Sequence, residues 1–246
     1  MPVVRFPDPR SATTDGIVAL GGDLQVETLL LAYRQGIFPW PMHGLPLTWV
    51  CPLMRAVLNF EELHIPRSLA KERARSTFTF TIDRDFPAVI EACAQASRPD
   101  QPGTWITGRM LRAYNRFHER GYAHSVEVWD GEELVGGLYG VAVDGAFAGE
   151  SMFHRRPNAS KLALLFLIDH LKERGLDWID IQMMTPHMEI LGAREIPRLE
   201  FLDKLSATHR RNLKLFDSQP PASARTADTD GGLQAETSPK SRKHSS

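Results

Sequence analysis

AHSVEVWDGEELVGGLYGVAVDGAFAGESMF, residues Ala123 to Phe153, predicts three β-strands joined by two tight turns. The strand-like runs are Ala123–Trp129, Leu134–Val143 and Ala146–Phe153. An Asp-Gly pair follows each of the first two runs, and such a pair between β-rich runs is a strong hairpin signal. Strands joined by turns this short pair antiparallel, so the stretch predicts an antiparallel core for the fold.

Predicted helices and one further strand flank this stretch. Thr107 is placed to cap a helix from Gly108 to Arg120, and Asn158 to cap one from Ser160 to Arg174. Leu176–Gln182 follows as a strand, with helical segments after it. This order predicts an α+β fold in which helices pack on a mixed, mainly antiparallel sheet. The acetyltransferase-like fold is one of several that fit the order.

The remainder of the chain predicts two further regions. Residues 1–100 are loop-rich, and we expect them to form a smaller N-terminal α/β domain that ends near Gln101–Thr104. Residues 101–217 then carry the larger domain. Residues 218–246 contain one leucine and no aromatic residue, so they cannot bury enough apolar surface to offset the entropy of ordering. We expect a disordered tail there.

Composition limits the partners and the location of the protein. The 246 residues carry a formal net charge of −1, which excludes the broad basic surface of proteins that coat nucleic acid. Contact with RNA would therefore depend on local patches. Residues 1–9 contain prolines and an acid where a signal peptide needs an apolar run, and no apolar stretch approaches the ~20 residues of a membrane span. We expect a cytoplasmic protein without membrane contact.

Several common chemistries are disfavoured by the motifs. Gly149-Glu150-Ser151-Met152-Phe153 begins like a G-x-S-x-G nucleophile elbow, but Phe153 takes the place of the second glycine. The Gly-Gly pairs lack the Gly-Lys-Ser/Thr of a phosphate-binding loop. The two cysteines form no C-x-x-C pair, and the nine histidines show no metal-ligand spacing. The sequence therefore predicts neither a cofactor nor a metal.

Three polar residues on predicted strands are candidates for chemistry. Glu150 lies in an otherwise apolar strand, where a carboxylate is costly unless it is paired or faces a cleft. A glutamate on a solvated edge strand explains the pattern equally well. Asp180 and Gln182 share one face of the strand Trp178–Gln182 and could hold an amine and a carbonyl. Taken alone, that segment favours a plain amphipathic strand with one wet face.

Two tryptophans are candidates for RNA contact. Trp40 lies in a proline-flanked loop, and Trp105 precedes the helix cap at Thr107. Exposed aromatic rings on loops are good platforms for stacking a base, at roughly 1–3 kcal/mol each. Filling the core remains the more common role of any single tryptophan.

Eight short motifs follow one another from about Gly16 to Leu205. They are LGGDL (20–24), GIFPW (36–40), GTWIT (103–107), HSVEVW (124–129), LVGGLYGV (134–141), GESMF (149–153), NASK (158–161) and LGAREIPR (191–198). In this order and with these spacings, the motifs resemble the leucyl/phenylalanyl-tRNA–protein transferase family. No single motif is diagnostic, but the ordered set is very specific.

The resemblance implies a fold, a reaction and partners. It implies a small N-terminal domain followed by an acetyltransferase-like domain. The implied reaction moves leucine or phenylalanine from leucyl-tRNA or phenylalanyl-tRNA, gripped at the 3′ aminoacyl-adenosine end, to the α-amine of acceptor proteins with N-terminal Arg or Lys. The product carries a destabilising N-terminus for the N-degron degradation pathway. We expect no cofactor, and a monomer.

The resemblance also assigns roles to residues of this chain. Trp40 and Trp105 match the tryptophans that flank the terminal adenosine. The apolar pocket for the transferred side chain is matched by Leu138, Phe147, Gly149, Met152, Leu164, Leu167 and Ile179. Glu150, Asp180 and Gln182 match the residues assigned to positioning or catalysis.

Two versions of the mechanism are open for these three polar residues. In the first, Asp180 receives or relays the amine proton, Gln182 orients the amine or carbonyl, and Glu150 helps to fix the donor ribose or the acceptor. In the second, all three only position the substrates, and a hydroxyl of the tRNA assists.

One segment departs from the family pattern. Where the family usually has Trp-Ser-Pro-Asp-Pro-Arg, this chain has Trp49-Val50-Cys51-Pro52-Leu53-Met54-Arg55. Leu53 removes a charge and a hydrogen-bond acceptor, which puts acceptor preference or tRNA affinity in question more than the reaction.

Two other classes of protein compete with the transferase hypothesis. An acyl-CoA-dependent N-acetyltransferase needs a glycine-containing pyrophosphate loop, but Arg155–Ser160 fills both glycine-type positions and includes Pro157. A non-catalytic RNA-binding module would leave Glu150, Asp180 and Gln182 without a purpose.

Overall fold

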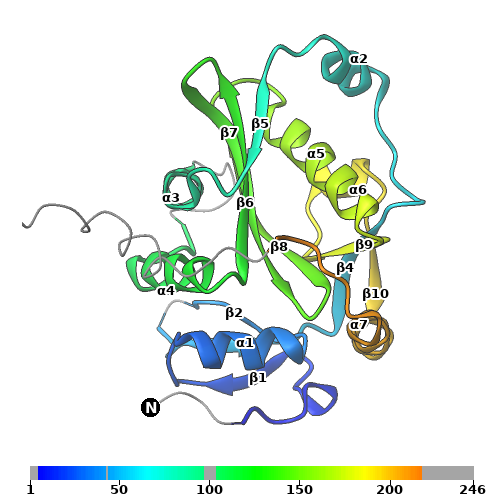
Figure 1. Cartoon of the computed structure of the whole chain (residues 1–246). Coiled ribbons are helices and arrows are strands. Elements are labelled where there is room, and N and C mark those ends of the chain that lie inside the picture. The colour runs from blue at the N-terminus through cyan, green and yellow to red at the C-terminus, as the bar shows by residue number, and fades with distance from the viewer. Residues whose placement is uncertain (1–4, 43, 97–103, 218–246) are drawn as a thin grey trace, which may run out of the picture.

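The computed structural model describes residues 5–42, 44–96 and 104–217 (Figure 1). The α-helices are α1 (Val26–Arg34), α2 (Arg67–Arg75), α3 (Phe86–Gln95), α4 (Gly108–Glu119), α5 (Ala159–Glu173), α6 (Pro186–Ile190) and α7 (Arg198–Arg211). The strands are β1 (Ile17–Leu20), β2 (Phe38–Pro39), β3 (Thr48–Val50), β4 (Met54–Asn59), β5 (Thr79–Ile82), β6 (Ala123–Asp130), β7 (Glu133–Val143), β8 (Ala146–His154), β9 (Trp178–Gln182) and β10 (Arg194–Pro197).

The main sheet has seven strands in the order β10-β4-β9-β8-β7-β6-β5. Strands β8 and β9 pair in parallel, and the other neighbours pair antiparallel. The predicted meander is β6-β7-β8, and Asp144 and Gly145 both adopt the positive φ that a tight hairpin turn requires (48° and 82°). The predicted α+β class, with a mixed and mainly antiparallel sheet, is confirmed.

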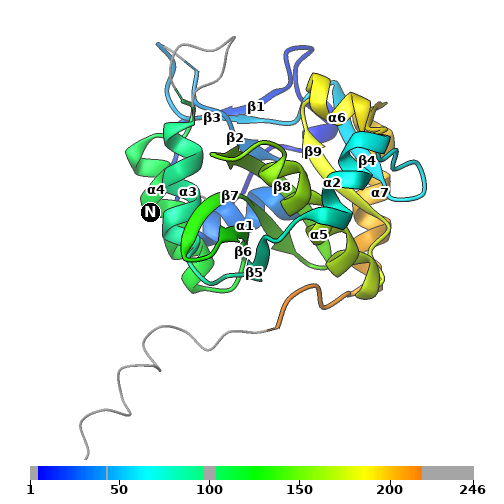
Figure 2. The same ribbon diagram turned by 90° about the horizontal axis from the view of Figure 1, so that it is seen from above.

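Helices cover both faces of this sheet (Figure 2). Adjacent glycines of β7 let them approach closely: a Cβ on Gly136 would lie 2.5 Å from Cβ of Ala159 in α5, and one on Gly137 would lie 3.5 Å from Val89 in α3. Successive strand residues point to opposite faces, so α5 packs on one face and α3 on the other.

The predicted caps of two helices have different outcomes. Thr107 caps α4, because its side chain accepts a hydrogen bond from the backbone N–H of Met110. Asn158 occupies the N-cap of α5, but its backbone is left-handed (φ 64°) and its side chain makes no capping hydrogen bond. The helix is therefore confirmed, whereas the capping role of the Asn158 side chain is wrong.

A second, three-stranded sheet of order β1-β3-β2 packs with α1 below the main sheet (Figure 1). Strands β4 and β5 precede residue 100 but belong to the main sheet. The main sheet therefore draws on both sides of the predicted boundary near Gln101–Thr104, and the division into domains 1–100 and 101–217 stays a prediction. The predicted tail, 218–246, lies outside the described residues.

The end of the described chain returns to the main sheet. Phe216 stacks on His124 of β6 and His170 of α5, with ring centroids 3.8 and 5.0 Å apart, and Leu215 is buried.

Among the described helices, none has the length and apolar character needed to cross a membrane.

Candidate active site

The parallel pair β8 and β9 brings the three polar candidates together. Its register pairs Ala148 with Asp180. Two residues further along each strand stand Glu150 and Gln182, and Nε2 of Gln182 donates a 2.7 Å hydrogen bond to Oε1 of Glu150. The sheet thus joins residues that lie 32 positions apart in the chain.

Glu150 occupies a β-bulge. Gly140 pairs with Gly149 and Tyr139 pairs with Ser151, so Glu150 has no partner of its own on β7. A bulge re-aims a side chain, and bulges are common beside active sites. Here the carboxylate turns toward α1 and α4, where it meets two tyrosines, Tyr33 and Tyr114.

Burial makes Glu150 unusually basic for a carboxylate. Desolvation raises its pKa from 4.5 to about 7, and the nearby charge of Asp180 adds to the rise. Hydrogen bonds from Tyr33 and Gln182 and the charge of Arg55 oppose it. At neutral pH the group is therefore present in both protonation states, as suits a proton carrier.

Asp180 is engaged by a buried arginine. Nε and Nη2 of Arg55 in β4 donate to its two oxygens at 2.8 and 2.6 Å. Arg55 is 1% exposed and Asp180 5%, and the guanidinium lies between the rings of Phe38 and Phe201, 4.6 and 4.4 Å from their centroids. Because both oxygens already accept hydrogen bonds, Asp180 is better placed to hold structure than to take a proton.

Asp180 stabilises the backbone conformation of Gln182. This residue has a φ of 65°, a left-handed conformation that is uncommon outside glycine and is often found at functional sites. Its backbone N–H donates to Oδ1 of Asp180 at 2.9 Å. The hydrogen bond from Nε2 to Glu150 orients the amide of Gln182, so that its carbonyl oxygen and its second N–H remain for a substrate.

Two of the residues predicted to line the apolar pocket, Leu138 and Met152, lie on the α5 face of the sheet. Leu138, like Gly136, belongs to the α5 face of β7, and it pairs across the sheet with Met152. The members Leu138, Phe147, Leu164, Leu167 and Ile179 are buried, whereas Gly149 and Met152 are partly exposed. A Cβ on Gly149 would meet nothing nearer than the backbone oxygen of Asp180, at 3.8 Å. A side chain at Gly149 would therefore make only an ordinary contact with β9.

The two predicted tryptophans are in contact. Trp40, after β2, and Trp105, before α4, stack with ring centroids 5.5 Å apart and an angle of 27° between their planes. Both are partly exposed. A base that enters between them must therefore separate the rings, and their role in binding adenosine stays a prediction.

Sequence reasoning missed Tyr33, Tyr114 and Arg55 as members of the site. Both tyrosines lie on buried faces of amphipathic helices, where they look like core residues. Arg55 carried one signal, because it keeps its place in the segment that otherwise departs from the family pattern. In that segment Leu53 and Met54, which replace the aspartate and the second proline of the family pattern, face solvent (52% and 42% exposed).

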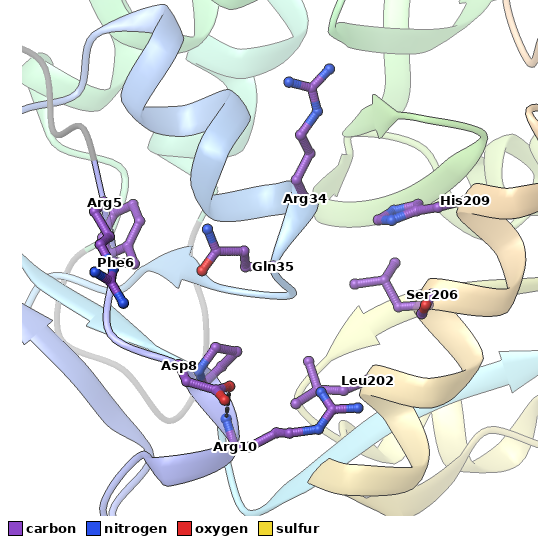
Figure 3. Close-up of a pocket in the computed structure, with 11 residues that line it drawn as sticks. Arg5, Phe6, Asp8, Arg10, Arg34, Gln35, Leu202, Ser206 and His209 are labelled. Atoms are coloured by element: carbon purple, nitrogen blue, oxygen red, sulfur yellow. Dashed lines mark hydrogen bonds between the residues drawn. The ribbon is translucent and has the colours of Figure 1, made fainter.

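The structure also has a separate cavity of about 440 Å³ (Figure 3). The residues before β1, the end of α1 and the helix α7 surround it, with Arg5, Arg10 and Arg34 among its lining residues. None of the predicted site residues lines it. Its arginines disfavour it as the place for a cationic side chain of an acceptor.

The turn before α5 does not offer a pyrophosphate cradle. The backbone N–H groups of Arg155 and Arg156 both donate to the carbonyl of Val135, and that of Ala159 donates to Arg156. Pro157 has no N–H. An anion cradle needs such groups pointing outward, so this geometry argues against the acyl-CoA alternative.

Comparisons with known proteins show the family of the chain. Residues 57–206 match the family "Leucyl/phenylalanyl-tRNA protein transferase", and residues 22–53 match the N-terminal domain of the same family. A leucyl/phenylalanyl-tRNA–protein transferase of Anaeromyxobacter dehalogenans (strain 2CP-C) is 47% identical over 90% of this chain and all of that protein. The one of Syntrophus aciditrophicus (strain SB) is 50% identical over 85% of this chain and 87% of that protein.

A solved ribosomal-protein-alanine N-acetyltransferase from Brucella melitensis biovar Abortus 2308 overlaps to a smaller extent. Its TM-score is 0.30 and its identity 17%, over 40% of this chain and 74% of that chain. We draw no function from this overlap.

The fold, the site and the relatives define an aminoacyltransferase with a mixed, mainly antiparallel sheet. The chain belongs to the leucyl/phenylalanyl-tRNA–protein transferase family.

Proposed function

We propose that this enzyme transfers leucine or phenylalanine from its tRNA to proteins whose first residue is Arg or Lys, and so marks them for the N-degron pathway. The observation that carries the proposal is the contact between Glu150 and Gln182 where β8 meets β9. It sets a carboxylate of raised pKa beside an oriented amide, in a strand whose other residues are mostly apolar. The choice of acceptors rests on the family resemblance.

The reaction does not require a strong acid or a strong base from the protein. The donor is an ester and already activated, and the acceptor is an α-amine, whose ordinary pKa is about 7.7–8.0. A substantial fraction of that amine is neutral near pH 7. The enzyme must therefore orient two substrates, accept one proton and stabilise the oxyanion.

The geometry divides these tasks among the three polar residues. We assign proton acceptance to Glu150, whose pKa is about 7. Gln182 orients the amine through its carbonyl oxygen, and Asp180 keeps Gln182 in its left-handed conformation. In the first version of the mechanism predicted from the sequence, Asp180 accepts the amine proton; here Glu150 accepts it instead. The orienting role predicted for Gln182 is unchanged.

The predicted pocket favours particular donors. Leucine and methionine side chains adapt to γ-branched or planar donor side chains. A β-branched donor would be rejected by shape, and a charged donor by the cost of burying an unpaired charge. Leucine and phenylalanine fit these limits.

The first test is label transfer from leucyl-tRNA to reporter proteins that begin with Arg, Lys, Asp or Met. We expect transfer to the Arg and Lys reporters alone, and its loss after RNase treatment of the donor. Transfer only to the Asp reporter would keep the reaction and reject the proposed acceptors. Absence of transfer, with turnover of acetyl-CoA instead, would reject the proposal.

A further inference from the structure

Two tyrosine hydroxyl groups form a directed chain to Glu150. The hydroxyl oxygen of Tyr33 lies 2.7 Å from Oε1 of Glu150 and 2.6 Å from the hydroxyl of Tyr114. Tyr114 lies 3.4 Å from Oε2 of Glu150. Each hydroxyl has a single proton to donate. Because Tyr33 uses its proton on Glu150, Tyr114 supplies the proton of the short contact between the tyrosines.

Both tyrosines are held in place by the core. Tyr33 of α1 is 7% exposed and Tyr114 of α4 is fully buried. Their rings pack against Phe117 and Tyr139, with centroids 6.0 and 5.7 Å apart. Burial and the charge of Glu150 hold the pKa of both hydroxyls well above 10, so both remain protonated donors at neutral pH.

The hydrogen bonds distinguish the two oxygens of Glu150. Oε1 accepts from both Tyr33 and Gln182 at 2.7 Å, whereas Oε2 has only the long contact with Tyr114. Oε2 is therefore the oxygen at which a substrate proton is most easily accepted. The tyrosines also fix the direction in which this oxygen points.

We propose that Tyr33, supported by Tyr114, is a positioning residue that holds the ionised carboxylate of Glu150 with Oε2 toward the acceptor amine. The proposal rests on the proposed function and deepens it. It assigns to α1 and α4 a part in the reaction, although neither tyrosine need touch a substrate.

The proton and the bonds balance in this arrangement. The neutral amine attacks the ester carbonyl, and a C–N bond forms while one amine proton passes to Oε2 of Glu150. The ester C–O bond then breaks, and the same proton passes from Glu150 to the departing ribose oxygen. Glu150 returns to its ionised form, held as before by Tyr33 and Gln182. No further reactant is needed.

The charged groups around Glu150 determine the direction of the expected pH effect. Asp180 and Arg55 of the neighbouring strands act on it in opposite directions, and both stay in place when a tyrosine is changed. The hydrogen bond from Tyr33 lowers the pKa of Glu150. Its removal should therefore raise that pKa, and the enzyme should need a higher pH to become active.

The experiment compares the pH dependence of kcat for Tyr33→Phe, Tyr114→Phe and Tyr122→Phe with that of the wild-type enzyme. Tyr122 packs on Phe117 and serves as the matched control. We expect Tyr33→Phe to move the acidic limb of the pH profile of kcat upward by about one pH unit, because the variant loses a hydrogen bond to a charged group. Tyr114→Phe should move it less, and Tyr122→Phe should leave it unchanged. The acceptor amine titrates identically in all four enzymes.

Other outcomes separate this proposal from its alternatives. A fall of kcat at every pH with an unmoved limb in both Tyr33→Phe and Tyr114→Phe would show a purely structural role and overturn the proposal. Adding Tyr33→Phe to Glu150→Gln should cause no further shift, and a shift there would also overturn it. If the wild-type enzyme transfers label to no reporter, the proposed function itself fails, and this is seen before any variant is compared.

Discussion

At the scale of single residues, Glu150 shows how burial raises the pKa of an ordinary carboxylate. A strand position inside a sheet removes water, and two tyrosines and an amide replace part of what is lost. The resulting balance places its pKa at about 7, near the pKa of the amine it would serve. The composition of the strand alone predicted a carboxylate in an apolar setting and could not distinguish this from a solvated edge.

The raised pKa of Glu150 predicts a cost in stability at high pH. The carboxyl has a pKa of about 7 in the folded protein and an ordinary value of 4.5 when unfolded, so the folded state binds more protons between these values. The free energy of unfolding should fall by up to about 3 kcal/mol as the pH rises through 7. Glu150→Gln should remove this dependence, measured by urea unfolding at pH 5 and pH 8. Glu132→Gln, at an exposed glutamate, is the control and should behave as the wild type.

The ion pair of Arg55 and Asp180 predicts a large effect of removing one partner. Asp180→Asn leaves a buried guanidinium without its counter-charge and should lower the free energy of unfolding by about 3–5 kcal/mol. Replacing both residues with leucine should be less destabilising than the single change, because no charge is left unpaired. Urea denaturation of the three proteins measures this. A single variant within about 1 kcal/mol of the wild type (a small shift on the scale of typical point mutations) would contradict the assignment of Asp180 to a structural role.

At the scale of elements, the β7 strand sets how closely helices approach the sheet. Gly136 faces the start of α5, where a Cβ would lie 2.5 Å from that of Ala159. Real side chains do not approach so closely, so the helix must move. Because α5 contributes Leu164 and Leu167 to the predicted pocket, such a movement would reach the donor side chain.

Gly136→Ala should therefore lower both stability and donor use. Overpacking of this kind costs about 1–3 kcal/mol, and we expect the KM for leucyl-tRNA to rise with it. The matched control is Gly108→Ala at the start of α4, where the nearest atom to an added Cβ is 3.8 Å away, in the side chain of Arg112. Thermal unfolding and the KM for leucyl-tRNA measure the two effects. An unchanged melting temperature in Gly136→Ala would contradict the packing argument.

At the scale of the whole molecule, the site is assembled from both parts of the chain. Arg55 and Tyr33 come from the first third of the sequence, whereas Glu150, Asp180 and Gln182 come from the two strands β8 and β9. The two stacked tryptophans also come from both parts of the chain: Trp40 follows β2 of the three-stranded sheet, and Trp105 precedes α4. Both parts therefore contribute side chains to the candidate site.

Trp105→Ala tests the contact between these parts. If the two rings bind the terminal adenosine, losing one should cost about 1–3 kcal/mol of stacking and raise the KM for leucyl-tRNA by roughly one to two orders of magnitude. The kcat should change less. Trp129→Phe is the control. Trp129 donates a hydrogen bond to Thr81 and lies on β6, two strands away from β8 in the main sheet. An unchanged KM in Trp105→Ala would reject the adenosine role.

By itself, the sequence determined the features that local patterns carry. Turn signals and strand periodicity predicted β6, β7 and β8, and the face shared by Asp180 and Gln182 was visible in their spacing. The family resemblance added the reaction class and the residues of the pocket. Each of these features depends on residues a few positions apart or on the order of the motifs, so the amino-acid sequence alone is sufficient to predict it.

Only the tertiary structure decided which groups meet at the site. Arg55 hydrogen-bonds to Asp180 across 125 positions, which requires the strand order that places β4 beside β9. Tyr33 hydrogen-bonds to Glu150 across 117 positions, which requires α1 to pack near β8. No local pattern encodes such a pairing, because it is the packing of helices and the registers of strands that bring these side chains within hydrogen-bonding distance. The sequence therefore identified the carboxylates, whereas the fold decided that Asp180 is held in an ion pair and that the pKa of Glu150 is raised.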